Sequence, residues 1–79
     1  MDARLRFEYD REGDILTIST KPPYKEQESE EIGDDVIVRL NPDTGDVEHV
    51  ELLFFSTRLL RGTLVDLPLT AELRLAQRS

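Results

Sequence analysis

Residues 36–54, VIVRLNPDTGDVEHVELLF, contain two runs of alternating apolar residues on either side of a short polar segment. Alternation with a period of two is typical of a strand with one buried face. In the polar segment, Pro42 fixes φ and Gly45 accepts a left-handed conformation, so the chain can reverse there, with Asn41 as a further turn residue. We therefore predict an antiparallel hairpin with strands at about 36–40 and 46–54. Its inner face is expected to carry Val36, Val38, Leu40, Val50, Leu52 and Phe54.

A second hairpin is predicted at the N-terminus, with strands at about 4–9 and 14–20. Residues 5–9 alternate apolar and charged side chains, and residues 15–20 are rich in β-branched residues. The loop between them is short, and Gly13 can supply the positive φ that such loops need. Asp10 and Asp14 are predicted to be structural turn residues. The core face of this hairpin is expected to carry Leu5, Phe7, Tyr9, Leu16 and Ile18.

The remaining segments complete an α+β fold, a small antiparallel sheet of two β-hairpins, in one domain over 1–79. Residues 25–35 are densely acidic and are expected to form a solvated loop or a frayed edge strand. Residues 57–61 are predicted to form a short helix, with Ser56 or Thr57 as its N-cap and Gly62 closing it. Residues 65–75 alternate apolar side chains and are predicted to form a C-terminal strand, with a helix as the alternative.

Composition restricts the partners of this chain. It has 79 residues and no cysteine, and a domain of this size buries only about 60% of its unfolded surface, so a partner chain could supply stability. The net charge is −7, and residues 1–57 hold 15 acidic and 6 basic side chains. This acidity argues against direct nucleic-acid binding and suits a basic protein or a second copy. With no signal peptide and no run near the roughly 20 apolar residues of a membrane span, we expect a cytoplasmic protein without membrane contact.

Few side chains are candidates for chemistry. His49 is the only histidine, and it is expected to face solvent on the side of its strand opposite Val50 and Leu52. Asp10 and Asp14 could form a carboxylate pair, but a small four-stranded domain offers no obvious pocket around them. Both are more simply predicted to accept hydrogen bonds from amides of their own loop.

A calcium site is also not expected. Asp43, Asp46 and Glu48 lie near the 41–46 turn, but the EF-hand spacing is absent, so they are predicted to be turn and exposed-face residues. No phosphate-binding loop, nucleophile elbow or zinc-protease motif is present in the sequence. We therefore expect no catalytic residue, no metal ligand and no cofactor.

Two surfaces are candidates for protein interaction. Large apolar side chains occur on both faces of the strand ending at Phe54 and continue beyond it, which is typical of a strand covered on both sides. Either the helix near Ser56 and the C-terminal segment, or a second chain, could provide that cover. The candidate interface comprises Leu52, Leu53, Phe54, Phe55, Leu59 and Leu60. A candidate acidic surface for a partner comprises Glu26, Glu28, Glu30, Glu31, Asp34 and Asp35.

A set of short motifs occurs in order along residues 5–60. These are Tyr9-Asp10-x-x-x-Asp14-x-Leu16-x-Ile18, Asp35-Val36-Ile37-Val38, a turn centred on Gly45, Val50-Glu51-Leu52-Leu53, and Ser56-x-Arg58-Leu59. The set resembles the mostly prokaryotic family called domain of unknown function 2283. Thr17 stands where that family usually has an aromatic residue, and His49 stands where it has a glycine.

The resemblance implies the hairpins but no reaction, because the family has no assigned function. Its members look like stand-alone proteins often encoded beside small ribonuclease-like toxins, which implies an antitoxin-like role as one hypothesis. The leading hypothesis from the residues is a non-enzymatic protein-interaction domain that self-associates or binds a cognate protein. A third hypothesis is a small hydrolase or metal-binding protein that uses Asp10, Asp14 and His49.

Overall fold

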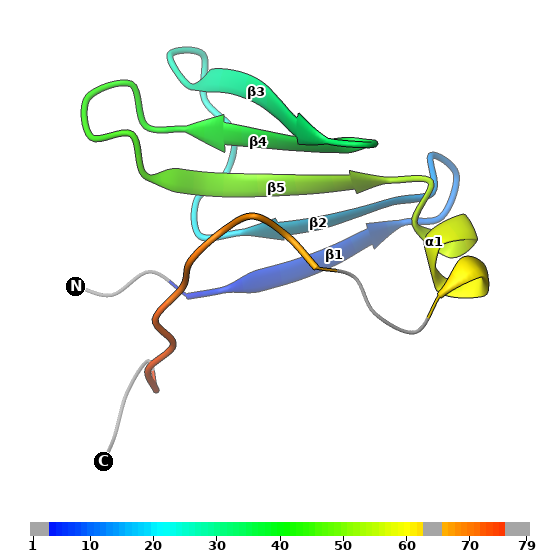
Figure 1. Ribbon diagram of the computed structural model, residues 1–79. Coiled ribbons are helices and arrows are strands. Elements are labelled where there is room, and N and C mark those ends of the chain that lie inside the picture. The colour runs from blue at the N-terminus through cyan, green and yellow to red at the C-terminus, as the bar shows by residue number, and fades with distance from the viewer. Residues whose placement is uncertain (1–3, 63–65, 76–79) are drawn as a thin grey trace.

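The computed structural model describes residues 4–62 and 66–75, which form a five-stranded antiparallel sheet and a short helix (Figure 1). The α+β class expected from the sequence is confirmed. The order across the sheet is β1-β2-β5-β4-β3, so β5 is central and β1 and β3 are the edges. The elements are β1 (Arg6–Asp10), β2 (Ile15–Ser19), β3 (Glu28–Gly33), β4 (Val36–Leu40), β5 (Val47–Leu53) and α1 (Phe55–Arg61).

The acidic segment contributes an edge strand that the two-hairpin prediction did not include. β3 pairs antiparallel with β4 through a tight turn at Asp34 and Asp35, and Asp35 adopts a left-handed φ of 60°. Of the two possibilities left open for residues 25–35, the edge strand is therefore the one observed. Its exposed glutamates are compatible with an edge because their side chains stay in solvent while the backbone pairs on one side.

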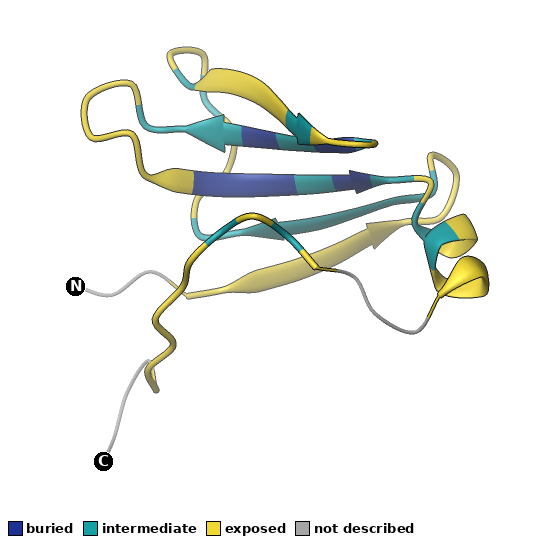
Figure 2. Cartoon of the chain, in the orientation of Figure 1, coloured by how far each residue is buried: buried dark blue, intermediate teal, exposed yellow. Residues whose placement is uncertain are grey.

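The core lies on one face of the central strands. Val36 and Val38 of β4 are buried against Val50 and Leu52 of β5, and Figure 2 shows the burial concentrated there. A bulge at Ile32 in β3 interrupts the pairing with β4, and the Ile32 side chain joins this cluster. Other half-buried residues pack around the four, namely Leu16, Ile18, Leu40, Phe55, Leu67 and Leu69.

The prediction that Leu5, Phe7 and Tyr9 belong to the core was wrong. Their exposed fractions are 47%, 65% and 44%, and all of β1 is exposed (Figure 2). Pairing does align Phe7 with Ile18, and β2 in turn aligns Ile18 with Val50. Phe7 therefore lies on the same face of the sheet as the core, in line with Ile18 and Val50 across the strands. Because β1 is an edge strand, Phe7 nevertheless remains open to solvent.

Two predictions at the end of β5 were also wrong. Phe54 does not face inward but is exposed, and its φ of 53° ends the strand and makes it the N-cap of α1 in place of Ser56 or Thr57. The abrupt change of direction lets Phe55 pack against the core cluster. Gly62 does end the helix, donating its N–H to the carbonyl of Arg58.

The predicted C-terminal strand is not formed in residues 66–75, nor is the alternative helix. Val65 lies outside the described residues. The segment instead passes over the sheet as irregular chain with a bend at Pro68, and Leu67 and Leu69 pack against the core cluster (Figure 1). Leu73 and Leu75, which continue the apolar alternation, are exposed, and Pro68 cannot donate a ladder hydrogen bond.

Candidate functional site

Asp14 joins the first hairpin to the helix. It occupies the β1–β2 turn with a φ of 57°, so the left-handed residue is Asp14 rather than Gly13. Its Oδ1 accepts the hydroxyl of Tyr9 at 2.5 Å and the backbone N–H of Ser56 at 3.0 Å, and its Oδ2 accepts the Ser56 hydroxyl at 2.7 Å. Its carbonyl accepts the N–H of Phe55 at 3.0 Å. Asp14 therefore caps α1 from a distant position in the sequence.

These contacts favour the ionised carboxylate. The Tyr9 hydroxyl, and then the Ser56 hydroxyl and amide, lower the pKa of Asp14, because each donates to the charged form. The same hydrogen bond raises the pKa of Tyr9, because the phenol must keep its proton to donate. Both groups are held in the protonation states that they have at neutral pH, so the pair suits a structural contact better than proton transfer.

The helix also contacts the β3–β4 turn. The guanidinium of Arg58 donates to the backbone carbonyl of Asp34, and the carbonyl of Asp35 accepts the N–H of Leu53 at 2.8 Å. Helix α1 is therefore tied to both hairpin turns at this end of the sheet, through Ser56 on one side and Arg58 on the other.

Substitution of Asp14 tests this capping role. Asn tolerates a left-handed φ, so Asp14→Asn keeps the backbone but loses the charged acceptor, and we expect a melting temperature lower by about 5 °C. Asp14→Ala should lower it further because alanine is strained at this φ. Thermal unfolding followed by circular dichroism gives both values. Asp43→Asn, in an exposed turn, is the matched control, and equal melting temperatures for Asp14→Asn and wild type would contradict the role.

The remaining turn candidates make local contacts. Asp10 Oδ1 accepts the N–H of Glu12 at 3.1 Å, and a Cβ added to Gly13 would lie 2.9 Å from Asp10 Oδ2, so this turn is tight. Asn41 Oδ1 accepts the amides of the next turn, from Asp43 at 2.8 Å and from Thr44 at 3.1 Å. Gly45 supplies the left-handed φ, 78°, that this turn was expected to need.

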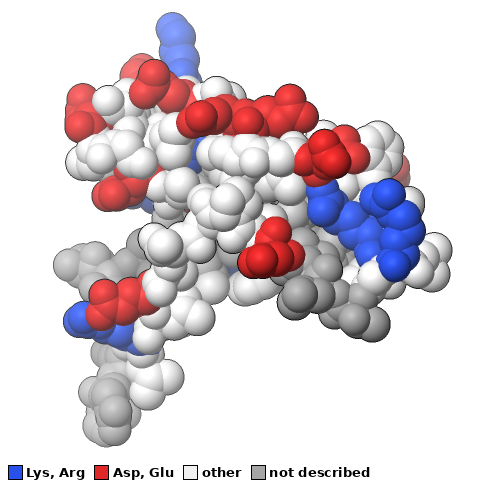
Figure 3. Space-filling view, in the orientation of Figure 1, with Lys and Arg blue, Asp and Glu red and all other residues white. Residues whose placement is uncertain are grey.

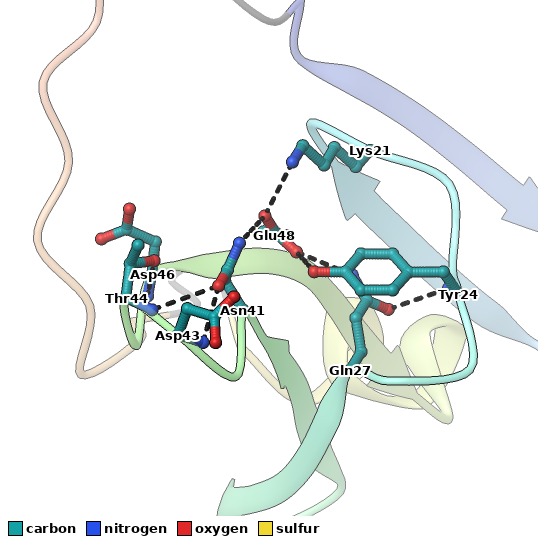
Figure 4. Close-up of polar contacts among 8 residues, drawn as sticks. All are labelled: Lys21, Tyr24, Gln27, Asn41, Asp43, Thr44, Asp46 and Glu48. Carbon is teal, nitrogen blue, oxygen red and sulfur yellow. Dashed lines mark hydrogen bonds and ion pairs between the residues drawn. The ribbon is translucent and has the colours of Figure 1, made fainter.

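Glu48 lies at the opposite end of the sheet and is buried, so its prediction as an exposed-face residue was wrong. It is the extra residue of a bulge, because Leu40 pairs with Val47 and Arg39 with His49. Figure 4 shows its carboxylate at the centre of a polar cluster. Oε1 accepts from the Tyr24 hydroxyl at 2.6 Å and from Gln27 Nε2 at 3.0 Å, while Oε2 accepts from Asn41 Nδ2 at 3.2 Å and faces Lys21 Nζ at 3.3 Å.

This cluster anchors the connection that crosses from β2 to β3. Lys21, Tyr24 and Gln27 all belong to that connection, and the N–H of Thr20 donates to the Glu48 carbonyl at 3.0 Å. Hydrogen bonds from Tyr24 and then Gln27 lower the pKa of Glu48 to about 2, and Glu48 in turn raises the pKa of Tyr24 to about 12. Glu48 therefore stays charged and the tyrosine neutral over a wide pH range.

His49 does not face solvent as predicted, since only 6% of it is exposed. It lies on the central strand, where Ser19 of β2 and Arg39 of β4 are its cross-strand neighbours. Its Nε2 is 3.9 Å from a carboxylate oxygen of Glu51. His49 pairs at the Ser19 end of β2, whereas Asp10 and Asp14 lie at the turn next to Ile15. The three proposed catalytic residues are therefore not brought together.

The candidate interface residues divide into two groups. Leu52 is in the core with 2% exposure and is not accessible to a partner, and Leu53 and Phe55 are half-buried. Phe54, Leu59 and Leu60 are exposed on α1 or at its start. Most of the candidate acidic residues are exposed on and near β3, and Figure 3 shows acidic side chains along this edge. Asp35 is half-buried in its turn.

Comparison with known proteins identifies the family. The family described as "protein of unknown function (DUF2283)" matches residues 6–56, which is more than half of the chain. The chain belongs to this family. No curated protein and no solved structure matched it.

The motifs on which the resemblance rests acquire a physical meaning from these contacts. Tyr9, Asp14 and Ser56 come from motifs far apart in the sequence, and they meet in one hydrogen-bonded group. Arg58, which lies just beyond the matched residues 6–56, reaches the carbonyl of Asp34 in the β3–β4 turn. The ordered motifs thus hold together the end of the sheet that carries the helix.

Sequence reasoning missed the Glu48 cluster, although one signal was available. Glu48 has the same parity as Val50 and Leu52, and a charge at an inward position of a strand requires buried partners.

Within residues 4–62 and 66–75, no group of three or more His, Asp or Glu side chains could hold a metal ion. The same residues include no helix long and apolar enough to cross a membrane.

Proposed function

We propose that this DUF2283 protein is a non-enzymatic interaction domain that binds a second copy of itself or a cognate protein. The observation that carries the proposal is the exposure of Phe7 and Tyr9 on the edge strand β1 and of Leu5 just before it. An edge strand presents backbone donors and acceptors to solvent beside those side chains, and such a surface can accept another strand.

The small size of the core supports the proposal. Among the described residues, four hydrophobic residues are buried, whereas nine large hydrophobic residues are exposed. Scattered exposed apolar residues are ordinary, but those of β1 align with a core row, as Phe7 does with Ile18. A partner's strand or side chain that covers β1 would extend the core without further folding of this chain, because β1 is already formed.

The polar groups support a non-enzymatic role. The carboxylates with clearly lowered pKa values, Asp14 and Glu48, are engaged by hydrogen bonds that hold turns and connections in place. A general acid or base needs a pKa near the working pH and access to a substrate. His49 is only 6% exposed, so its imidazole has little access to a substrate.

Light scattering after size-exclusion chromatography tests the proposal across protein concentrations. We expect a mass above that of one chain for the wild type, and a lower mass for Phe7→Ser. If the wild type is a monomer, a pull-down from the native host should capture a protein with the wild type that Phe7→Ser does not capture. A monomer whose captured proteins do not change with Phe7→Ser would overturn the proposal.

A second candidate function is that of an acidic antitoxin-like partner for a basic ribonuclease-like protein. It is favoured by the β3 edge, where Glu28, Glu30 and Glu31 are all exposed. Opposite charge accelerates encounter between proteins and makes the association rate depend on salt. Changing these three residues to lysine should slow association with such a ribonuclease and flatten its salt dependence. Unchanged rates would remove this version.

A further inference from the structure

We propose that β1 pairs antiparallel with β1 of a second copy, about a two-fold axis at Phe7. The inference rests on the self-associating form of the proposed function and names the surface and the register. The two sheets would then form one continuous sheet, with five strands from each copy. This use of the edge satisfies the backbone groups that β1 presents on the side away from β2.

The charge pattern of the strand is self-complementary. Residues 4–10 read RLRFEYD, so two basic side chains precede Phe7 and two acidic ones follow it at matching distances. In an antiparallel pair centred on Phe7, Arg6 lies opposite Glu8 of the other copy, and Arg4 lies opposite Asp10. Each cross-strand charge pair is then attractive, and the symmetry produces each pair twice.

The apolar side chains match in the same register. Phe7 faces Phe7 of the second copy, and Leu5 faces Tyr9, all on the face of the sheet that carries the core. Within one copy, Phe7 continues the row of Ile18, Val50 and Val38. Pairing through β1 therefore joins two core rows and covers side chains that are 44–65% exposed in the single chain.

Neighbouring registers lose this agreement. A shift of one position places Phe7 opposite a charged residue and moves apolar side chains to the wrong face. A shift of two positions places Glu8 opposite Glu8, or Arg6 opposite Arg6, and like charges directly opposite are destabilising. The other edge is unsuitable for self-pairing, because β3 carries Glu28, Glu30 and Glu31 and contains a bulge.

Charge reversal tests the register in the full-length protein. Arg6→Glu alone places acidic residues opposite each other, and Glu8→Lys alone does the same with basic residues. Each should weaken the dimer by roughly tenfold or more, measured as the dissociation constant by sedimentation equilibrium. The double variant R6E/E8K restores opposite charges across the axis and should regain an affinity close to the wild type. Glu30→Lys, on the other edge, is the control and should leave the affinity unchanged.

A disulfide test reports the contact directly, because the chain contains no cysteine. Phe7→Cys should form a dimer under mild oxidation, since residues at the axis come close enough for a disulfide. Leu60→Cys, which is 88% exposed on α1, should not form one. A dimer whose dissociation constant is unchanged by both charge reversals would overturn the β1 pairing but not self-association. The same holds for a dimer that is linked by a disulfide only in the Leu60→Cys variant. A wild-type monomer at all concentrations would overturn both.

Discussion

Replacing Leu52 by alanine is expected to lower the free energy of unfolding by about 2–5 kcal/mol, the range for truncating a buried leucine. Leu52 is 2% exposed and lies between Leu16 of β2 and Val36 of β4 on the core face. Native domains have about 0.05–0.15 kcal/mol of stability per residue, so the loss takes a large share of the total for a chain of this size. Urea denaturation monitored by circular dichroism measures it.

Leu60→Ala is the matched control for this prediction. It is the same chemical change at a side chain that is 88% exposed, and we expect a change within about 0.5 kcal/mol, as for other surface substitutions. The two variants distinguish a core residue from an exposed residue of the candidate interface, because that interface was predicted to contain both Leu52 and Leu60. Equal effects of Leu52→Ala and Leu60→Ala would contradict the assignment of Leu52 to the core.

Glu48→Gln is expected to have the second large effect. One carboxylate oxygen accepts from Tyr24 and Gln27, and the other meets the amide of Asn41 and the ammonium of Lys21. A glutamine can replace only one of these oxygens, so its amide nitrogen faces groups that also donate. We expect the melting temperature at neutral pH to fall by about 10 °C, because half-buried donors such as the Tyr24 hydroxyl and the Asn41 amide compete for the single remaining acceptor oxygen.

The pH dependence of this effect has a definite sign. The pKa of Glu48 is lowered from 4.5 to about 2 in the folded protein, so its contribution is complete above pH 4.5 and disappears as the pH falls towards 2. The difference in melting temperature between wild type and Glu48→Gln should therefore be largest near neutral pH and shrink across that window. Because Asp14 also has a lowered pKa, the comparison with Glu48→Gln isolates the contribution of Glu48.

Glu26→Gln, at an exposed position of the same connection, is the control and should leave the acid profile unchanged. A constant difference between wild type and Glu48→Gln from neutral pH to pH 2 would show that the charge of Glu48 does not stabilise the fold.

Local sequence signals predicted strands and turns where the predicted inner face of a strand is also the face that the core covers. The 36–54 stretch forms β4 and β5, and its Asn41–Asp46 turn uses Gly45 in the left-handed conformation. Alternation failed for residues 66–75, since Leu67 and Leu69 contact the core without forming a strand. It also failed to show that β1 is open to solvent, because alternation reports which face a side chain occupies but not what covers that face.

The candidate site was less predictable because its contacts join distant segments. The turn role expected for Asp14 understated its contacts, which reach Ser56, 42 positions later. Predicting the buried contacts of Glu48 would have required knowledge of the bulge in β5 and of the path from β2 to β3. Predicting the burial of His49 would have required knowing that β5 is the central strand. Neighbouring strands there enclose a side chain that would face solvent on an edge strand.

By itself, the sequence determined the acidic charge, the family, the local strand and turn segments, and the self-complementary order of charges around Phe7. These properties depend on residue identity and on interactions between near neighbours. Only the tertiary structure decided that β5 is central, that β1 and β3 are the edges, and that Asp14 and Glu48 hold opposite ends of the sheet. Strand order and long-range hydrogen bonds depend on which faces and edges the whole chain leaves available, and a local pattern carries no record of that.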